Sequence, residues 1–100
     1  MDNRIQKMAQ VLINYSTKVK PGDLVVFRGT SPAAQPLMQA LTEETLKAGG
    51  HPFSYIHLSD EDVIMLRNGS EQQLEAINPM LKLMYETANV IIRIEADEST

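Results

Sequence analysis

The stretch VVFRGTSPAAQPLMQAL, residues 25–41, is the clearest indication of the fold in this sequence. It opens with an uninterrupted apolar run, passes through one glycine and a serine-proline pair, and continues with apolar residues at helical spacing. A continuous apolar run of this length is typical of a strand that is covered on both faces, as in parallel sheets. The stretch therefore predicts a buried strand that leads directly into a helix, which is the repeating unit of α/β folds.

The residues before this strand predict an amphipathic helix. Apolar residues recur there at helical spacing and form one stripe: Ile5, Met8, Ala9, Leu12 and Tyr15. The pair Pro21-Gly22 is a turn signal, so the helix is expected to end near Thr17.

The helix after the strand is expected to end at Gly49-Gly50, which supply left-handed positions. Its start has two interpretations. If Ser31 caps the helix, Pro36 falls at the fifth position and costs a hydrogen bond. If the helix begins near Gln35, Pro36 lies in the first turn, where proline is favourable. Both interpretations remain open at this point.

Two more strands and a helical segment complete the pattern. HPFSYIHL, residues 51–58, predicts a second strand with Pro52 confined to its start, and NVIIRI, residues 89–94, predicts a third. The segment between them holds two possible capping boxes and one proline-started helix: Ser59 with Asp62, Ser70 with Gln73, and Asn78-Pro79.

Strands that alternate with helices predict a three-layer α/β fold, in which a parallel or mostly parallel sheet is flanked by helices. We expect one domain over residues 1–100. The chain ends in EADEST, residues 95–100, directly after a core strand, where a parallel sheet normally continues into a helix. On this ground alone, a truncated piece of a larger fold and a complete small domain are equally open.

The composition indicates which classes of binding partner are disfavoured and which cellular compartment is expected. The chain is 43% hydrophobic and 22% charged with a net charge of −4, which disfavours nucleic acid and anionic membranes as partners. No window approaches the roughly 18 consecutive apolar residues of a membrane span, and the first residues do not resemble a signal peptide. The absence of cysteine excludes disulfides and thiolate metal sites. A cytoplasmic protein is expected.

The loop after the first strand is the first candidate site. It comprises Arg28, Gly29, Thr30 and Ser31. Open α/β sheets bind ligands at the carboxyl ends of their strands, and free amides at a helix start can hold an anion. The loop has one glycine, however, and neither a G-x-G-x-x-G nor a G-K-[ST] pattern. Pro32 and Pro36 also remove two N–H donors. The sequence favours a structural role over a phosphate site.

The remaining polar residues do not form a catalytic set. His51 and His57 share one strand face but would lie roughly 20 Å apart at about 3.3 Å per residue, too far to share an ion. Asp60, Glu61 and Asp62 begin a helix, where negative side chains favour the helix dipole. No serine lies in a G-x-S-x-G context. The chain alone is therefore predicted to hold no catalytic residue and no metal site.

Three stretches, in order, resemble the start of the thermophilic-type metallo-aminopeptidases. They are LINYSTKVKPGDLVVFRG (12–29), LMQALTEETLKAGGHPF (37–53) and YETANVIIRIEA (85–96). The family includes bacterial leucyl aminopeptidases, aminopeptidase T and aminopeptidase S. The likeness covers nearly the whole chain, including asparagine-tyrosine-serine before K-x-K-P-G-D and alanine-glycine before H-P-F.

The resemblance implies a cytoplasmic exopeptidase that removes N-terminal residues from peptides with two divalent ions, zinc or cobalt. The family's ligands are glutamates, histidines and an aspartate of a carboxyl-terminal catalytic domain, and none of those motif positions falls within residues 1–100. The chain would then be the non-catalytic amino-terminal domain, which helps enclose the active-site cavity and takes part in a homodimer. Arg28 and the loop from Gly29 to Ser31 would face that cavity and contact a peptide terminus, or Arg28 would simply cap the sheet.

Two other classes remain open. One is a free-standing α/β module, flavodoxin-like or receiver-like, that binds a small anion at its strand ends. The first strand ends in Phe27-Arg28-Gly29, however, and lacks the acidic cluster of a receiver. The other is an interaction domain that dimerises through an exposed strand or through its first helix.

Overall fold

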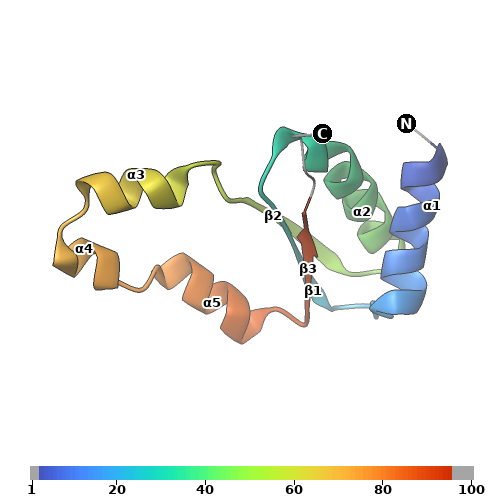
Figure 1. The fold of residues 1–100 in the computed structure, drawn as a ribbon. Helices are drawn as coiled ribbons and strands as arrows, with labels where there is room; N and C mark the ends of the chain where they lie inside the picture. The colour runs from blue at the N-terminus through green and yellow to red at the C-terminus, as the bar shows by residue number, and fades with distance from the viewer. Residues whose placement is uncertain (1–2, 96–100) are drawn as a thin grey trace.

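The computed structural model describes residues 3–95 and contains a three-stranded parallel sheet with helices on both faces (Figure 1). The elements follow in the order α1 (Asn3–Val11), a π-helical turn (Leu12–Ser16), β1 (Leu24–Gly29), a 3-10 turn (Pro32–Ala34), α2 (Gln35–Lys47), β2 (His51–Ile56), α3 (Glu61–Asn68), α4 (Glu71–Glu75), α5 (Pro79–Thr87) and β3 (Val90–Ile94). The expected α/β class and parallel sheet are confirmed. The expectation about the chain end rests on residues 96–100, which lie outside the described residues.

β1 lies in the middle of the sheet, in the order β2-β1-β3, and pairs in parallel with both neighbours. Val25, Val26 and Phe27 are all buried, so both faces of β1 are covered, as the apolar run predicted. β2 is an edge strand without a fully buried residue. None of the helices within residues 3–95 combines the length and the apolar character needed to cross a bilayer.

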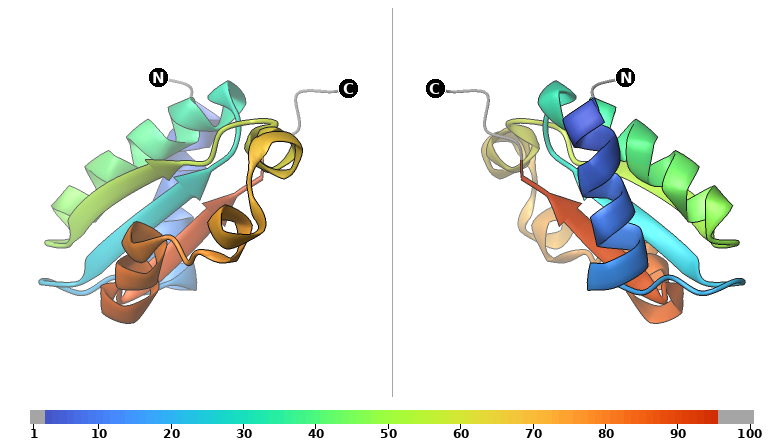
Figure 2. Two further views of the ribbon diagram at one scale, coloured as in Figure 1. Left: turned by 90° about the vertical axis from the view of Figure 1, so that its left-hand side faces the viewer. Right: turned by 90° about the vertical axis from the view of Figure 1, so that its right-hand side faces the viewer.

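α1 and α2 pack together over one face of the sheet (Figure 2, right). The buried residues of these helices and of the two strands β1 and β3 form one hydrophobic cluster: Ala9, Ile13, Val25, Phe27, Ala34, Met38, Ala40, Leu41, Ile92 and Ile94. The core therefore lies between this helix pair and the sheet, because burying the apolar stripes of both helices requires the sheet face.

The apolar stripe of the first helix differs in part from the expected one. Ala9 is buried as expected, but Met8 and Tyr15 are exposed, and the fully buried residue is Ile13. The chain passes from α-helix into the wider π-helical turn Leu12–Ser16, where each residue turns through a smaller angle. Met8 lies before this turn, and Ile13 follows Ala9 by four residues, so Ile13 belongs to the same helical stripe as Ala9 and the expected stripe omitted it.

The two interpretations of the start of α2 are each correct in part. Ser31 caps the short 3-10 turn Pro32–Ala34, because its side chain accepts a hydrogen bond of 3.1 Å from the Ala33 N–H. The α-helix itself begins at Gln35, with Pro36 in its first turn. Pro36 therefore removes no intrahelical hydrogen bond.

The two glycines after α2 serve different purposes. Gly49 has the expected left-handed backbone, with φ of 85°. Gly50 does not, and the prediction was wrong for this residue. A Cβ at Gly50 would lie 2.9 Å from Thr45 Cγ2 and 3.0 Å from Val19 Cγ1, so close packing requires glycine there.

The segment between β2 and β3 crosses the opposite face of the sheet as three short helices, α3, α4 and α5 (Figure 2, left). We call this segment, residues 61–87, the helical arm. None of the helical residues of the arm is fully buried. The radius of gyration is 15.4 Å, above the approximately 13 Å typical of a compact chain of this length. The third layer is present, but it packs loosely.

One of the two expected capping boxes is formed. The Ser70 side chain accepts from the Gln73 N–H at 3.2 Å, and the Gln73 side chain accepts from the Ser70 N–H at 2.9 Å. The Ser59 box is not formed, because Asp60 takes a left-handed conformation at the N-cap position and α3 begins at Glu61. Ser59 instead points to the loop after β1 and hydrogen-bonds there.

Candidate functional site

The loops after β1 and β2 lie side by side where these two strands end. Gly29 pairs with Ile56 at the last position of both strands, and the Gly29 carbonyl accepts a hydrogen bond of 2.9 Å from the His57 N–H. The Ser59 hydroxyl donates to the Thr30 carbonyl at 3.4 Å. We call this joint surface, residues 28–31 and 57–62, the carboxyl edge. It is the position at which open α/β sheets place ligands.

Arg28 connects three elements near the carboxyl edge. Its Nη1 donates a hydrogen bond of 3.0 Å to the Tyr85 hydroxyl in α5. Its guanidinium carbon lies 5.8 Å from the ring centroid of Tyr55 in β2, within the range of a cation–π contact. Its Nε is buried without a hydrogen-bond partner. Arg28 thus holds the sheet to the helical arm and keeps one donor unused.

A second arginine lies beside Arg28. Arg28 pairs in register with Arg93 of β3, and residues paired in this way project from the same face of a parallel sheet. Within residues 3–95 no ion pair connects either side chain to a carboxylate. Two adjacent positive charges without a counter-charge favour an anionic group at this position.

The rest of the loop is occupied by structural contacts. A Cβ at Gly29 would lie 2.8 Å from Met38 Sδ and 3.1 Å from the Ala34 Cβ, so glycine lets α2 approach β1 closely. Ser31 is buried, and the amides of Ala33 and Ala34 donate to its hydroxyl and carbonyl oxygens. These amides are therefore not free to hold a phosphate, which agrees with the structural role favoured for this loop.

The two histidines lie at opposite ends of β2, since His51 is its first residue and His57 follows its last. His57 is grouped with two carboxylates instead. Its Nδ1 lies 3.0 Å from Glu61 Oε2, and its Nε2 lies 3.6 Å from Asp62 Oδ1. One ligand atom from each of the three residues lies within 4.8 Å of the others. Within residues 3–95 this group alone has a composition and spacing suited to a metal ion.

Sequence reasoning missed this group. It compared His57 with His51, and it assigned the acidic residues to the helix dipole. The available signal was the spacing of His57, Glu61 and Asp62 across a strand-to-helix turn. The left-handed residue Asp60, with φ of 63°, makes that turn tight enough to bring the first helical carboxylates back to the histidine.

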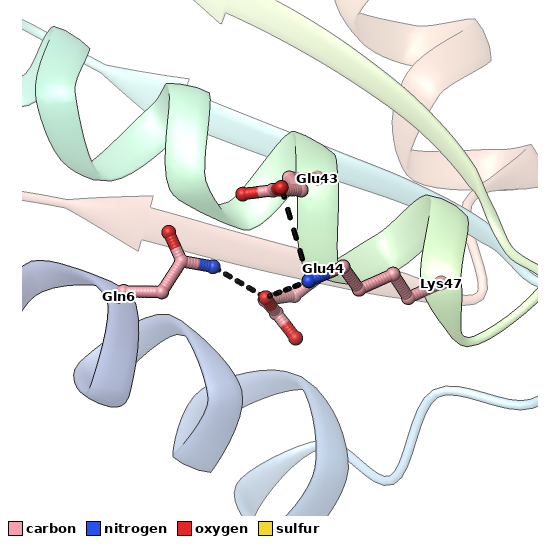
Figure 3. A network of polar contacts seen from close by, with 4 residues as sticks. All are labelled: Gln6, Glu43, Glu44 and Lys47. Carbon is pink, nitrogen blue, oxygen red and sulfur yellow. Dashed lines mark hydrogen bonds and ion pairs between the residues drawn. The ribbon is translucent and has the colours of Figure 1, made fainter. Parts of the chain in front are cut away.

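A second polar network lies away from the carboxyl edge, between α1 and α2 (Figure 3). Glu44 is only 5% exposed. Gln6 of α1 donates a hydrogen bond to Glu44 Oε2, and Lys47 Nζ lies 3.4 Å from the same oxygen and 3.8 Å from Glu43 Oε1. A buried carboxylate is tolerable only with such partners. This network joins the two helices α1 and α2.

The described residues fit one divalent ion but not two. His57, Glu61 and Asp62 supply three ligands, the number that a protein typically supplies to a zinc ion with an open coordination position. An ion held there would supply Lewis acidity or a more acidic bound water. A paired-ion site of the kind that the resemblance implies needs more ligands than this group contains.

Residues 1–100 match the model of a family described as thermophilic metalloprotease (M29). A search of curated proteins returned no match. Because the family match spans the whole chain, the chain belongs to the M29 family of thermophilic metalloproteases.

Proposed function

We propose that this chain is the amino-terminal domain of a metal-dependent aminopeptidase, which releases N-terminal amino acids from peptides. The observation that carries the proposal is the match to a metalloprotease family over residues 1–100. In this proposal a carboxyl-terminal catalytic domain of the same chain holds two divalent ions, zinc or cobalt, which polarise the scissile carbonyl and activate water.

The helical arm is the surface through which we propose that the domain encloses the active-site cavity. The arm exposes many large apolar side chains: Val63, Ile64, Met65, Leu66, Leu74, Ile77, Met80 and Leu83. Apolar surface concentrated on one segment marks an interaction site. We propose that the catalytic domain covers this surface and that the complete cytoplasmic enzyme is a homodimer.

Arg28 and the loop from Gly29 to Ser31 provide the proposed contact with substrate. The pair of Arg28 and Arg93 lacks a carboxylate partner within residues 3–95, and arginine binds carboxylates with two parallel hydrogen bonds. A peptide in the cavity carries such a group at its carboxyl terminus. We therefore propose that Arg28 binds and orients the peptide and takes no part in the chemistry.

The proposal is tested with the full-length gene product that contains these residues. We expect it to release the first residue of a short peptide with a free amino terminus and to leave the N-acetylated peptide intact. Removal of metal with a chelator should abolish release, and Zn²⁺ or Co²⁺ should restore it. Equal cleavage of the acetylated peptide, or release that is insensitive to chelation, would contradict the proposal.

A further inference from the structure

We propose that His57, Glu61 and Asp62 bind one divalent transition-metal ion at the carboxyl edge, with Zn²⁺ as the best-suited probe. The inference goes beyond the proposed function and does not depend on it, because it concerns ligands that the described residues themselves contain. It rests on three observations: the chemical types of the three side chains, the distances between their ligand atoms, and the buried His57 Nδ1 that makes no hydrogen bond.

The separations match those of ligands around one ion. His57 Nδ1 and Glu61 Oε2 are 3.0 Å apart. Zinc lies about 2.0–2.2 Å from nitrogen and oxygen ligands, so one ion can reach both atoms. Asp62 is the outermost of the three, with 82% of its side chain exposed, and it has room to rotate toward the ion. One ligand atom of each residue already lies within 4.8 Å of the others.

The His57 residue is held in place, and its Nδ1 makes no hydrogen bond. The backbone N–H of His57 donates to the Gly29 carbonyl, which ties the residue to the end of β1. Only 19% of its side chain is exposed. Its Nδ1 is buried and makes no hydrogen bond, although Glu61 Oε2 is 3.0 Å away. A buried nitrogen without a hydrogen bond is costly, and a bound cation would satisfy it.

The ligand types select the class of ion. Mg²⁺ and Ca²⁺ prefer oxygen ligands alone, whereas imidazole together with carboxylates suits zinc and related transition metals. Three protein ligands leave at least one position for water. The alternative is a purely structural group, in which His57 makes only polar contacts with the carboxylates of Glu61 and Asp62. That arrangement stabilises the start of α3 and has no affinity for metal.

The first experiment uses the unmodified chain, freed of metal with a chelator and then dialysed. Zn²⁺ is titrated by calorimetry, and the ring nitrogens of both histidines are followed by NMR. We expect one Zn²⁺ per chain and a large shift of a His57 ring nitrogen, while the His51 ring is unaffected. The absence of binding would overturn the proposal, as would a shift confined to His51.

The second experiment uses ligand variants with matched controls. His57→Gln, Glu61→Gln and Asp62→Asn each remove one ligand, while His51→Gln and Glu71→Gln alter an exposed histidine and an exposed glutamate elsewhere. Loss of an outer-sphere partner already costs about 10–100-fold in metal affinity, so loss of a direct ligand should cost at least about ten-fold. The controls should bind like the unmodified chain.

Circular dichroism checks that each variant folds. If one ligand variant fails to fold, the other two and the NMR measurement on the unmodified chain still decide the question. Unchanged affinity in folded His57→Gln or Glu61→Gln, or a loss of affinity in His51→Gln, would overturn the proposal.

Discussion

At the scale of single residues, the buried carboxylate of Glu44 shows how polar chemistry is accommodated in the core of this chain. Two side chains contact the Glu44 carboxylate. Gln6 belongs to the other helix, α1, and Lys47 lies one turn further along α2. Lys47 is mostly exposed, so solvent weakens its contribution, and the amide of Gln6 is the more important partner.

We predict that Gln6→Ala lowers the free energy of unfolding by about 1–3 kcal/mol, because it removes the amide donor of the buried Glu44 Oε2 and leaves this oxygen only the largely exposed Lys47. Gln10→Ala on the same helix is the matched control, since Gln10 is exposed and the change in helix propensity is the same. Urea denaturation of both variants measures the difference. Equal stability of the two variants would show that the contact contributes nothing.

Arg28 is the residue for which we predict an effect on substrate binding. In the full-length enzyme, Arg28→Ala should raise KM for peptides by about ten-fold, the equivalent of about 1.4 kcal/mol, with kcat little changed. Tyr85→Phe is the control, because it removes the structural hydrogen bond of Arg28 but leaves its charge. Unchanged kinetics of Arg28→Ala would remove the proposed role, and so would an equal rise of KM in Tyr85→Phe.

The candidate site was only partly predictable from single residues. The prolines after the first strand favour a structural loop over a phosphate cradle, and in the structure the amides of Ala33 and Ala34 donate to Ser31. The His57 group escaped prediction, since it depends on the left-handed Asp60, a conformation that is uncommon outside glycine. The contact of Arg28 with Tyr85 spans 57 positions and follows only from the tertiary fold.

For the secondary-structure elements, local sequence patterns predict where strands and helices lie, but they do not predict how these elements pack together. The apolar run of β1 predicted burial on both faces, and the spacing in α2 predicted its core face, because these patterns report directly on burial. The stripe of the first helix was predicted only in part, since Met8 and Tyr15 are exposed and the buried Ile13, four residues after Ala9, was not included. The loose attachment of the helical arm was likewise invisible, since its helices carry ordinary caps and apolar residues.

We predict that the backbone amides of the helical arm exchange with solvent much faster than those of α2. The helices of the arm have no fully buried residue, whereas α2 buries Met38, Ala40 and Leu41. Segments with few buried contacts open locally at low free energy. Hydrogen exchange followed by mass spectrometry should show protection at least about a hundred-fold lower in α3 and α4 than in α2. Equal protection would contradict the loose packing of the arm.

At the scale of the whole molecule, two features dominate: a packed half formed by α1, α2 and the sheet, and an apolar arm on the other face (Figure 1). The principal extents are 44, 35 and 16 Å, so the molecule is flat and exposes much of its arm. An apolar surface of this kind needs a cover, which agrees with the proposed packing against a catalytic domain.

We predict that the isolated chain self-associates through the arm. Leu66 is 71% exposed on α3, and Leu66→Glu should reduce association by adding charge to the apolar surface. Leu46→Glu on α2 is the matched control, because Leu46 is 61% exposed on the opposite side of the sheet. Sedimentation velocity over a range of concentrations measures the mass. A monomer at high concentration, or an equal effect of the two variants, would contradict the prediction.

The central claim is that this domain belongs to a metallo-aminopeptidase but does not itself carry the catalytic groups. The most direct measurement compares release of the first residue of a peptide by the chain of residues 1–100 and by the full-length gene product. Both are used at equal molar concentration with Zn²⁺ or Co²⁺ present. We predict metal-dependent release by the full-length protein and none above the blank by residues 1–100. Comparable turnover by the isolated chain, or no metal-dependent release by the full-length protein, would contradict it.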